Sequence, residues 1–109
     1  MISGCSGGVD RMCGGSGNDQ IRGDDDVLVF ANGGAGADFI VGGEGNNLLH
    51  GGDDNDRVVD VVGNDRPEGD AGNDTLEDEV GEDTDVLVGG PGFDTCDADI
   101  GDFFDLSPC

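Results

Sequence analysis

Residues 33–59 decide the fold, because they read GGAGADFIV, GGEGNNLLH and GGDDNDRVV, three consecutive units of nine residues. The same frame extends in both directions, over residues 5–13, 14–22, 60–68, 69–77, 80–88 and 89–97. Only the ten residues 23–32 break the period, and Asp78 and Glu79 are inserted between two units. A short fixed period indicates a repeat architecture, in which each unit stacks on copies of itself.

Each unit reads as six turn residues followed by a strand of three. Glycine recurs at positions one, two and four, where a tight stacked turn needs positive φ or close backbone approach. Position eight is apolar in most units, with Pro67 the exception, and is predicted to point inward: Met12, Ile21, Ile40, Leu49, Val58, Leu76, Leu87 and Cys96. Two units then form one coil of 18 residues, and each strand pairs with the strand one coil away. The sequence therefore predicts an all-β fold, a parallel β-roll (β-solenoid) of about five 18-residue coils.

The sixth position of the nine regular units is acidic in all but one case. It is occupied by Asp10, Asp19, Asp38, Asn47, Asp56, Asp65, Asp74, Asp85 and Asp94. A single Asp in a turn commonly bonds its own backbone, but eight in register indicate a shared ligand. Carboxylates and turn carbonyls together suit Ca²⁺, which takes six to eight oxygen ligands in flexible geometry. Magnesium demands a stricter octahedron, and softer metals prefer His or thiolate.

These units resemble the GGxGxDxUx nonapeptide of the RTX calcium-binding β-roll family over residues 5–97. The resemblance implies that calcium lies between stacked turns on the same edge, held by the sixth-position Asp and by turn carbonyls. The turn glycines assigned to the metal sites on this basis are Gly15, Gly17, Gly34, Gly36, Gly52, Gly72, Gly90 and Gly92.

Alternate units stack on the same edge, so the candidate sites fall into two rows. The first row, Asp19, Asp38, Asp56, Asp74 and Asp94, has Asp throughout, and we expect one calcium ion in each of its four gaps. The second row contains Asp10, Asn47, Asp65 and Asp85, together with Asp24 and Asp26 of the irregular unit. Glycines are missing there and one ligand is uncharged, so its sites should be fewer or weaker, Asp24, Asp26 and Asn47 above all.

Composition sets the class of partner. The 109 residues include 23 Gly and 26 acidic residues against four Arg and no Lys, for a net charge of -22. A polyanion repels phosphate, so nucleic acid is excluded as a partner, and calcium is the expected one. No stretch of the sequence is long and apolar enough for a transmembrane segment.

The four cysteines are predicted to form disulfides, which places the chain in an oxidising compartment, secreted or at an extracellular surface. Loop lengths favour pairing Cys5 with Cys13 and Cys96 with Cys109, whereas the spacing for a zinc site is absent. Residues 1–4 are expected to be an N-terminal tail, residues 5–97 the β-roll, and residues 98–109 a disulfide-tied cap over the last coil.

Catalysis is not expected. His50 is the only histidine and is predicted to face outward, and the serines are not placed beside a base, as a nucleophile requires.

The sequence thus predicts an extracellular calcium-binding β-roll that folds when the ion binds. One alternative is a structural protein that assembles with copies of itself into a calcium-dependent fibre or surface layer, through coil ends or outward apolar residues. Those outward residues are Phe39, Val41, Leu48, Val59, Val86 and Val88. A further alternative is a calcium-binding module of a secreted enzyme or toxin, since some members of the family attach the repeats to such domains.

Overall fold

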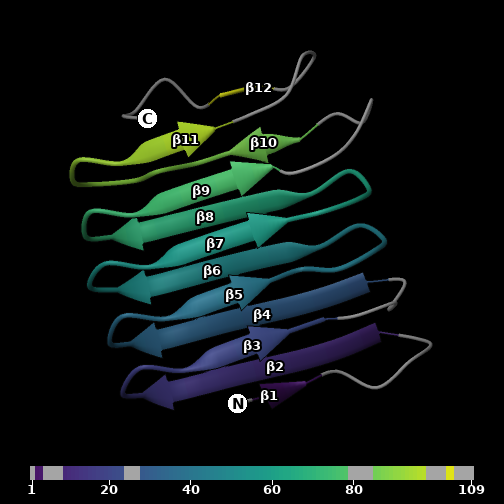
Figure 1. The fold of residues 1–109 in the computed structure, drawn as a ribbon, viewed down its shortest axis with the longest axis horizontal. Coiled ribbons are helices and arrows are strands. Elements are labelled where there is room, and N and C mark those ends of the chain that lie inside the picture. The colour runs from purple at the N-terminus through teal and green to yellow at the C-terminus, as the bar shows by residue number, and fades with distance from the viewer. Residues whose placement is uncertain (1, 4–8, 24–27, 79–84, 98–102, 105–109) are drawn as a thin grey trace.

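The chain folds into two layers of parallel strands in the computed structural model, which describes residues 2–3, 9–23, 28–78, 85–97 and 103–104. One layer is a six-stranded sheet in the order β1-β3-β5-β7-β9-β11 (Figure 1). Its strands are β1 Ile2–Ser3, β3 Gln20–Arg22, β5 Phe39–Val41, β7 Arg57–Asp60, β9 Thr75–Asp78 and β11 Thr95–Asp97.

The opposing layer is built mainly from a four-stranded sheet in the order β2-β4-β6-β8. Its strands are β2 Val9–Ser16, β4 Leu28–Ala35, β6 Leu48–Asp53 and β8 Arg66–Ala71. β10 Val86–Leu87 pairs with β12 Phe103–Phe104 and joins this layer through a bridge between Val88 and Glu68. The chain alternates between the layers, and the described residues contain no helix. The predicted all-β parallel β-roll is confirmed.

The strand register follows the sequence period. Ile40 pairs with Val58 and Val58 with Leu76, each a step of 18 residues. The ten-residue unit lengthens one coil by a residue, so Ile21 pairs with Ile40, 19 positions away. The two inserted residues lengthen a later coil, so Leu76 pairs with Cys96 at a step of 20. The inward positions therefore stay aligned through both irregularities.

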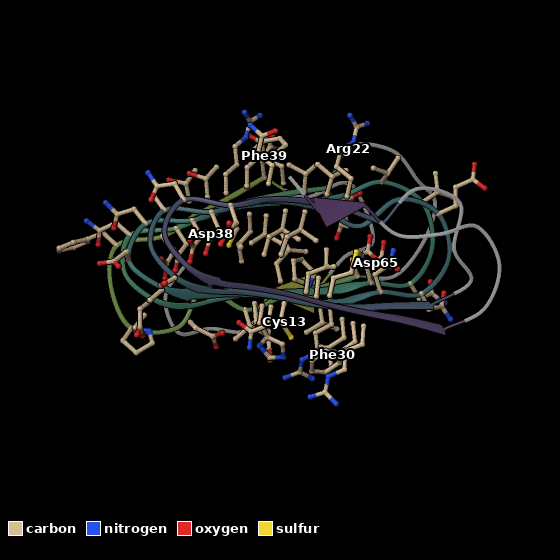
Figure 2. All side chains as sticks on the ribbon, turned by 90° about the horizontal axis from the view of Figure 1, so that it is seen from below. Cys13, Arg22, Phe30, Asp38, Phe39 and Asp65 are labelled. Carbon is tan, nitrogen blue, oxygen red and sulfur yellow. The ribbon has the colours of Figure 1, made fainter. Side chains whose placement is uncertain are left out.

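One inward side chain per strand fills the space between the layers (Figure 2). The predicted eighth positions are confirmed: the core contains Met12, Ile21, Ile40, Leu49, Val58, Leu76 and Leu87, with Ala31 from the irregular unit and Cys96 at its margin. Pro67 is also fully buried and pairs with Leu49, so it continues the stack although its ring nitrogen cannot donate a ladder hydrogen bond. The core is thin, with one column of inward side chains from each layer, which leaves much of the stability to the turns.

The strands differ from the prediction in length. Three-residue strands occur in the six-stranded sheet, but the strands of the opposing sheet have six to eight residues. The reason is that their pairing continues into the next turn, where Gly15, Gly34 and Gly52 are in register. Ile2 and Ser3, expected in a tail, pair with β3 and so extend the six-stranded sheet.

The outward apolar residues are also less exposed than predicted. Val59 is 3% exposed, because it lies in a strand flanked in register by Val41 and Glu77. Phe39, Val41, Leu48, Val86 and Val88 are half-buried. In the part of the chain that is described, no helix could cross a membrane.

Candidate metal centre

The first row of aspartates forms a ladder along one edge of the roll. Each residue ends a turn and immediately precedes a strand of the six-stranded sheet. The backbone N–H of Asp19 donates to Oδ1 of Asp38 at 2.8 Å, and that of Asp38 to Oδ1 of Asp56 at 2.8 Å. The same bond joins Asp56 to Asp74 and Asp74 to Asp94. This ladder brings all five predicted carboxylates into one column.

The second carboxylate oxygen is left without a donor at every rung. Oδ2 is buried and has no hydrogen-bond partner among the described residues in Asp19, Asp38, Asp56, Asp74 and Asp94. A buried oxygen of this kind costs free energy unless a hydrogen bond or a cation compensates it. The column of aspartates therefore offers negative charge and uncompensated carboxylate oxygens, as a row of cation sites requires.

Electrostatics gives the same conclusion. Burial raises the pKa of Asp56 to about 7, and the carboxylates of Asp74, Asp38 and Asp54 add to the rise, although the N–H of Asp38 lowers it. Burial likewise raises the pKa of Asp74 to about 6 and that of Asp38 above its ordinary value. These carboxylates disfavour their own ionisation, which a bound cation would reverse.

Turn carbonyls of one coil lie against the glycines of the next coil. All eight glycines predicted to belong to the sites have positive φ, between 87° and 135°. A Cβ on Gly34 or Gly36 would collide with the carbonyl oxygen of Gly15 or Gly17 in the preceding coil. Side chains are thus excluded and carbonyl oxygens stand in the gap, as oxygen ligation of calcium requires.

Asn47 shows what happens when the sixth residue is an amide. Its Nδ2 donates to the carbonyl oxygen of Gly45 in its own turn, at 3.2 Å. An aspartate at this position has no N–H to donate in the same way, and the Oδ2 atoms of the first-row aspartates are buried without a hydrogen-bond partner among the described residues. A cation beside such an oxygen would compensate it, as the amide hydrogen bond compensates Asn47.

The second row repeats the same ladder where it is described. The N–H of Asn47 donates to Oδ1 of Asp65, and the N–H of Asp65 to Oδ1 of Asp85, both at 2.6 Å. This edge lies opposite the first one, as the positions of Asp38 and Asp65 in Figure 2 show. Asp10 is in β2, with no side-chain position described, and Asp24 and Asp26 lie outside the described residues.

The sequence predicts close backbone approach at the first-position glycines but not contact with a carboxylate, and it predicts no role for the asparagines at position five. A Cβ on the first-position glycines would meet the sixth-position carboxylate, as at Gly14, where Oδ2 of Asp19 would be 2.6 Å away. Asparagine at position five forms a hydrogen bond with the next coil. Oδ1 of Asn55 accepts a hydrogen bond from the N–H of Asn73 at 2.8 Å, and Oδ1 of Asn73 accepts one from the N–H of Phe93 at 3.0 Å. The recurrence of Asn immediately before the sixth position was the available signal.

Aspartate replaces glycine at two positions with positive φ, Asp54 (75°) and Asp70 (67°). Asp is among the few residues that tolerate this region. Both use their side chains toward the preceding coil: Oδ2 of Asp54 accepts the N–H of Gly36 at 3.1 Å, and Oδ2 of Asp70 lies 3.2 Å from Nδ1 of His50.

The predicted Cys5–Cys13 disulfide is wrong, because Cys13 carries a free, exposed thiol. It lies outside the four-stranded sheet, next to the inward Met12, since neighbouring residues of a strand face opposite sides (Figure 2). Cys5 and Cys109 lie outside the described residues, so the pairing of Cys96 with Cys109 stays a prediction. His50 is half-buried on the outer face, and its Nδ1 lies 2.8 Å from Oε2 of Glu68.

Comparison with known families agrees with this geometry. Four copies of the RTX calcium-binding nonapeptide repeat match residues 6–28, 31–59, 62–96 and 79–102. These matches span most of the chain, which therefore belongs to the family of RTX calcium-binding repeat proteins. No curated protein and no solved structure matches it. The chain is accordingly a β-roll built from calcium-binding repeats.

Proposed function

We propose that calcium ions in the gaps of the first row complete the fold, so that the chain is a module that folds on calcium binding. The observation that carries this proposal is the column of buried Oδ2 atoms without donors, from Asp19 to Asp94. One ion in each of the four gaps would bridge two carboxylates and the carbonyls between them. Because each layer contributes only one column of inward side chains to the apolar core, the binding free energy becomes a large share of the folding free energy.

The proposed place of action is outside the cell. Free calcium is millimolar there and scarce in the cytosol, so the chain would stay unfolded during synthesis and fold after export. The module is proposed to be non-catalytic. The family match and the acidic composition support this setting.

A second candidate function is calcium-dependent assembly of copies of the chain. Among the described strands, β1 and β11 are the two ends of the six-stranded sheet, and an end strand can template pairing with a strand of another chain. Stacking of β11 on β1 of the next copy would be heterologous and would produce a filament. Phe93, 88% exposed beside β11, adds an apolar contact at that end.

A titration followed by far-UV circular dichroism and calorimetry tests the proposal. Calcium added to metal-free protein should produce β structure cooperatively and bind in several equivalents, whereas equal magnesium should do neither. Asp38→Asn should weaken binding, and Asp53→Asn, an exposed change in the following coil on the same edge, should not. Calcium binding with no change in structure would contradict the folding role, and no binding would contradict the whole proposal.

A further inference from the structure

Asp60 is buried where the repeat has glycine. It occupies the first position of its unit, as Gly42, Gly51 and Gly69 do in theirs. Its side chain is 0% exposed, and neither Oδ1 nor Oδ2 has a hydrogen-bond partner among the described residues. A wholly buried carboxylate with no donor is not explained by the turn geometry of the stacked repeats.

Two further carboxylates approach Asp60. Asp78 ends β9 and pairs in register with Asp60 at the end of β7. Asp85 precedes β10 in the opposing layer, and its Oδ1 accepts the N–H of Asp65 at 2.6 Å. One oxygen from each of Asp60, Asp78 and Asp85 lies within 4.8 Å of the other two. The ends of β7 and β9 in one layer and the residue before β10 in the other thus bring three carboxylate oxygens together.

Only a cation satisfies this arrangement if all three groups are ionised. Like charges at this separation repel by several kcal/mol at an effective dielectric constant of about 20. The ligands are all carboxylate oxygens, two of them on buried residues, Asp60 and Asp85. Hard oxygen ligands without nitrogen or sulfur favour Ca²⁺ over softer metals.

We propose that Asp60, Asp78 and Asp85 bind one calcium ion at a site that differs from the stacked-turn sites. The stacked sites would use only sixth-position carboxylates and glycine carbonyls, whereas this site adds two carboxylates at the ends of adjacent strands, Asp60 and Asp78, to the sixth-position Asp85. It strengthens the second edge at the coil that holds the inserted Asp78, where the glycine pattern is weakest. The competing explanation is a proton held between Asp60 and Asp78, with no ion.

Counting the bound calcium ions distinguishes the proposed calcium site from the shared proton. Native mass spectrometry and equilibrium dialysis should find one ion fewer in Asp60→Asn than in the unchanged chain, at a calcium concentration that just saturates the latter. The affinity of that one ion should fall at least tenfold. Asp78→Asn should lose the same ion, and Asp97→Asn, an exposed change of equal charge, should lose none.

Asp60→Gly controls for a loss of calcium that is due only to misfolding, because Gly42 occupies the equivalent position one coil earlier and glycine is therefore compatible with the fold. It should fold in calcium and also bind one ion fewer. If Asp60→Asn and Asp60→Gly both keep the full count and affinity, the site does not exist and the shared proton is correct. If the unchanged chain itself binds no calcium, the proposed function fails instead, so the two failures are distinguishable.

Discussion

Replacing Asp56 with Asn should have opposite effects in the absence and presence of calcium. The amide keeps the Oδ1 acceptor for the N–H of Asp38 but removes a buried charge. The pKa of Asp56 rises from 3.8 to about 7 in the fold, and one unit corresponds to about 1.4 kcal/mol. The ionised side chain therefore costs the calcium-free fold up to ~4 kcal/mol at neutral pH, and about half of that if the turn relaxes.

In calcium the same change should destabilise the protein. Asp56 borders two gaps of the first row, so the variant should bind two ions at least tenfold more weakly. Urea unfolding followed by circular dichroism measures both states, with trimethylamine N-oxide added to bring the calcium-free chain into its transition. Asp53→Asn, exposed in the same turn, should change either state by less than about 0.5 kcal/mol. If Asp56→Asn lowers stability equally with and without calcium, Asp56 is only a turn residue and the reasoning is refuted.

The remaining predictions concern pH, glycine and the second row. Without calcium, Asp56, Asp74 and Asp60 have pKa values raised to about 7, 6 and 9, so the fold binds protons more tightly than the unfolded chain. The stability of the calcium-free fold, measured by circular dichroism, should therefore be greatest near pH 4 and fall as the pH rises to 9. Calcium affinity should rise over the same range. A calcium-free fold that becomes more stable toward pH 9 would contradict this prediction. Gly34→Ala should destabilise the folded protein by at least 2 kcal/mol more than Gly15→Ala, roughly the cost of a buried clash. The two glycines have similar φ (94° and 97°), but only Gly34 has a backbone carbonyl where the new Cβ would lie. Equal losses of stability would refute the close stacking of the turns. Asn47→Asp should add one calcium ion, counted by native mass spectrometry, and an unchanged count would contradict the role given to the sixth position.

The coil architecture could be predicted because it depends on local spacing alone. The nine-residue period sets steps of 18 residues between paired strands, and the irregular unit and the insertion account for steps of 19 and 20. Position eight is inward because strand residues alternate, so the core column follows directly from the period.

The rest depends on contacts between coils, which one unit of sequence does not contain. In the sequence, Asp60 is simply a first position at which the repeat lacks its glycine, and only the stacking of coils places Asp78 and Asp85 beside it. The first-position glycines are required by a carboxylate five residues later that folds back over them. The thiol of Cys13 fits a short disulfide loop by spacing, but strand alternation points it outward.

Sedimentation velocity with chelator and with millimolar calcium tests the central claim most directly, since it measures compaction and assembly in one sample. The account predicts a slow, expanded chain in chelator and a compact, faster species in calcium. Growth into large species would favour the filament as the functional form. An identical sedimentation coefficient in both solutions would contradict calcium-driven folding.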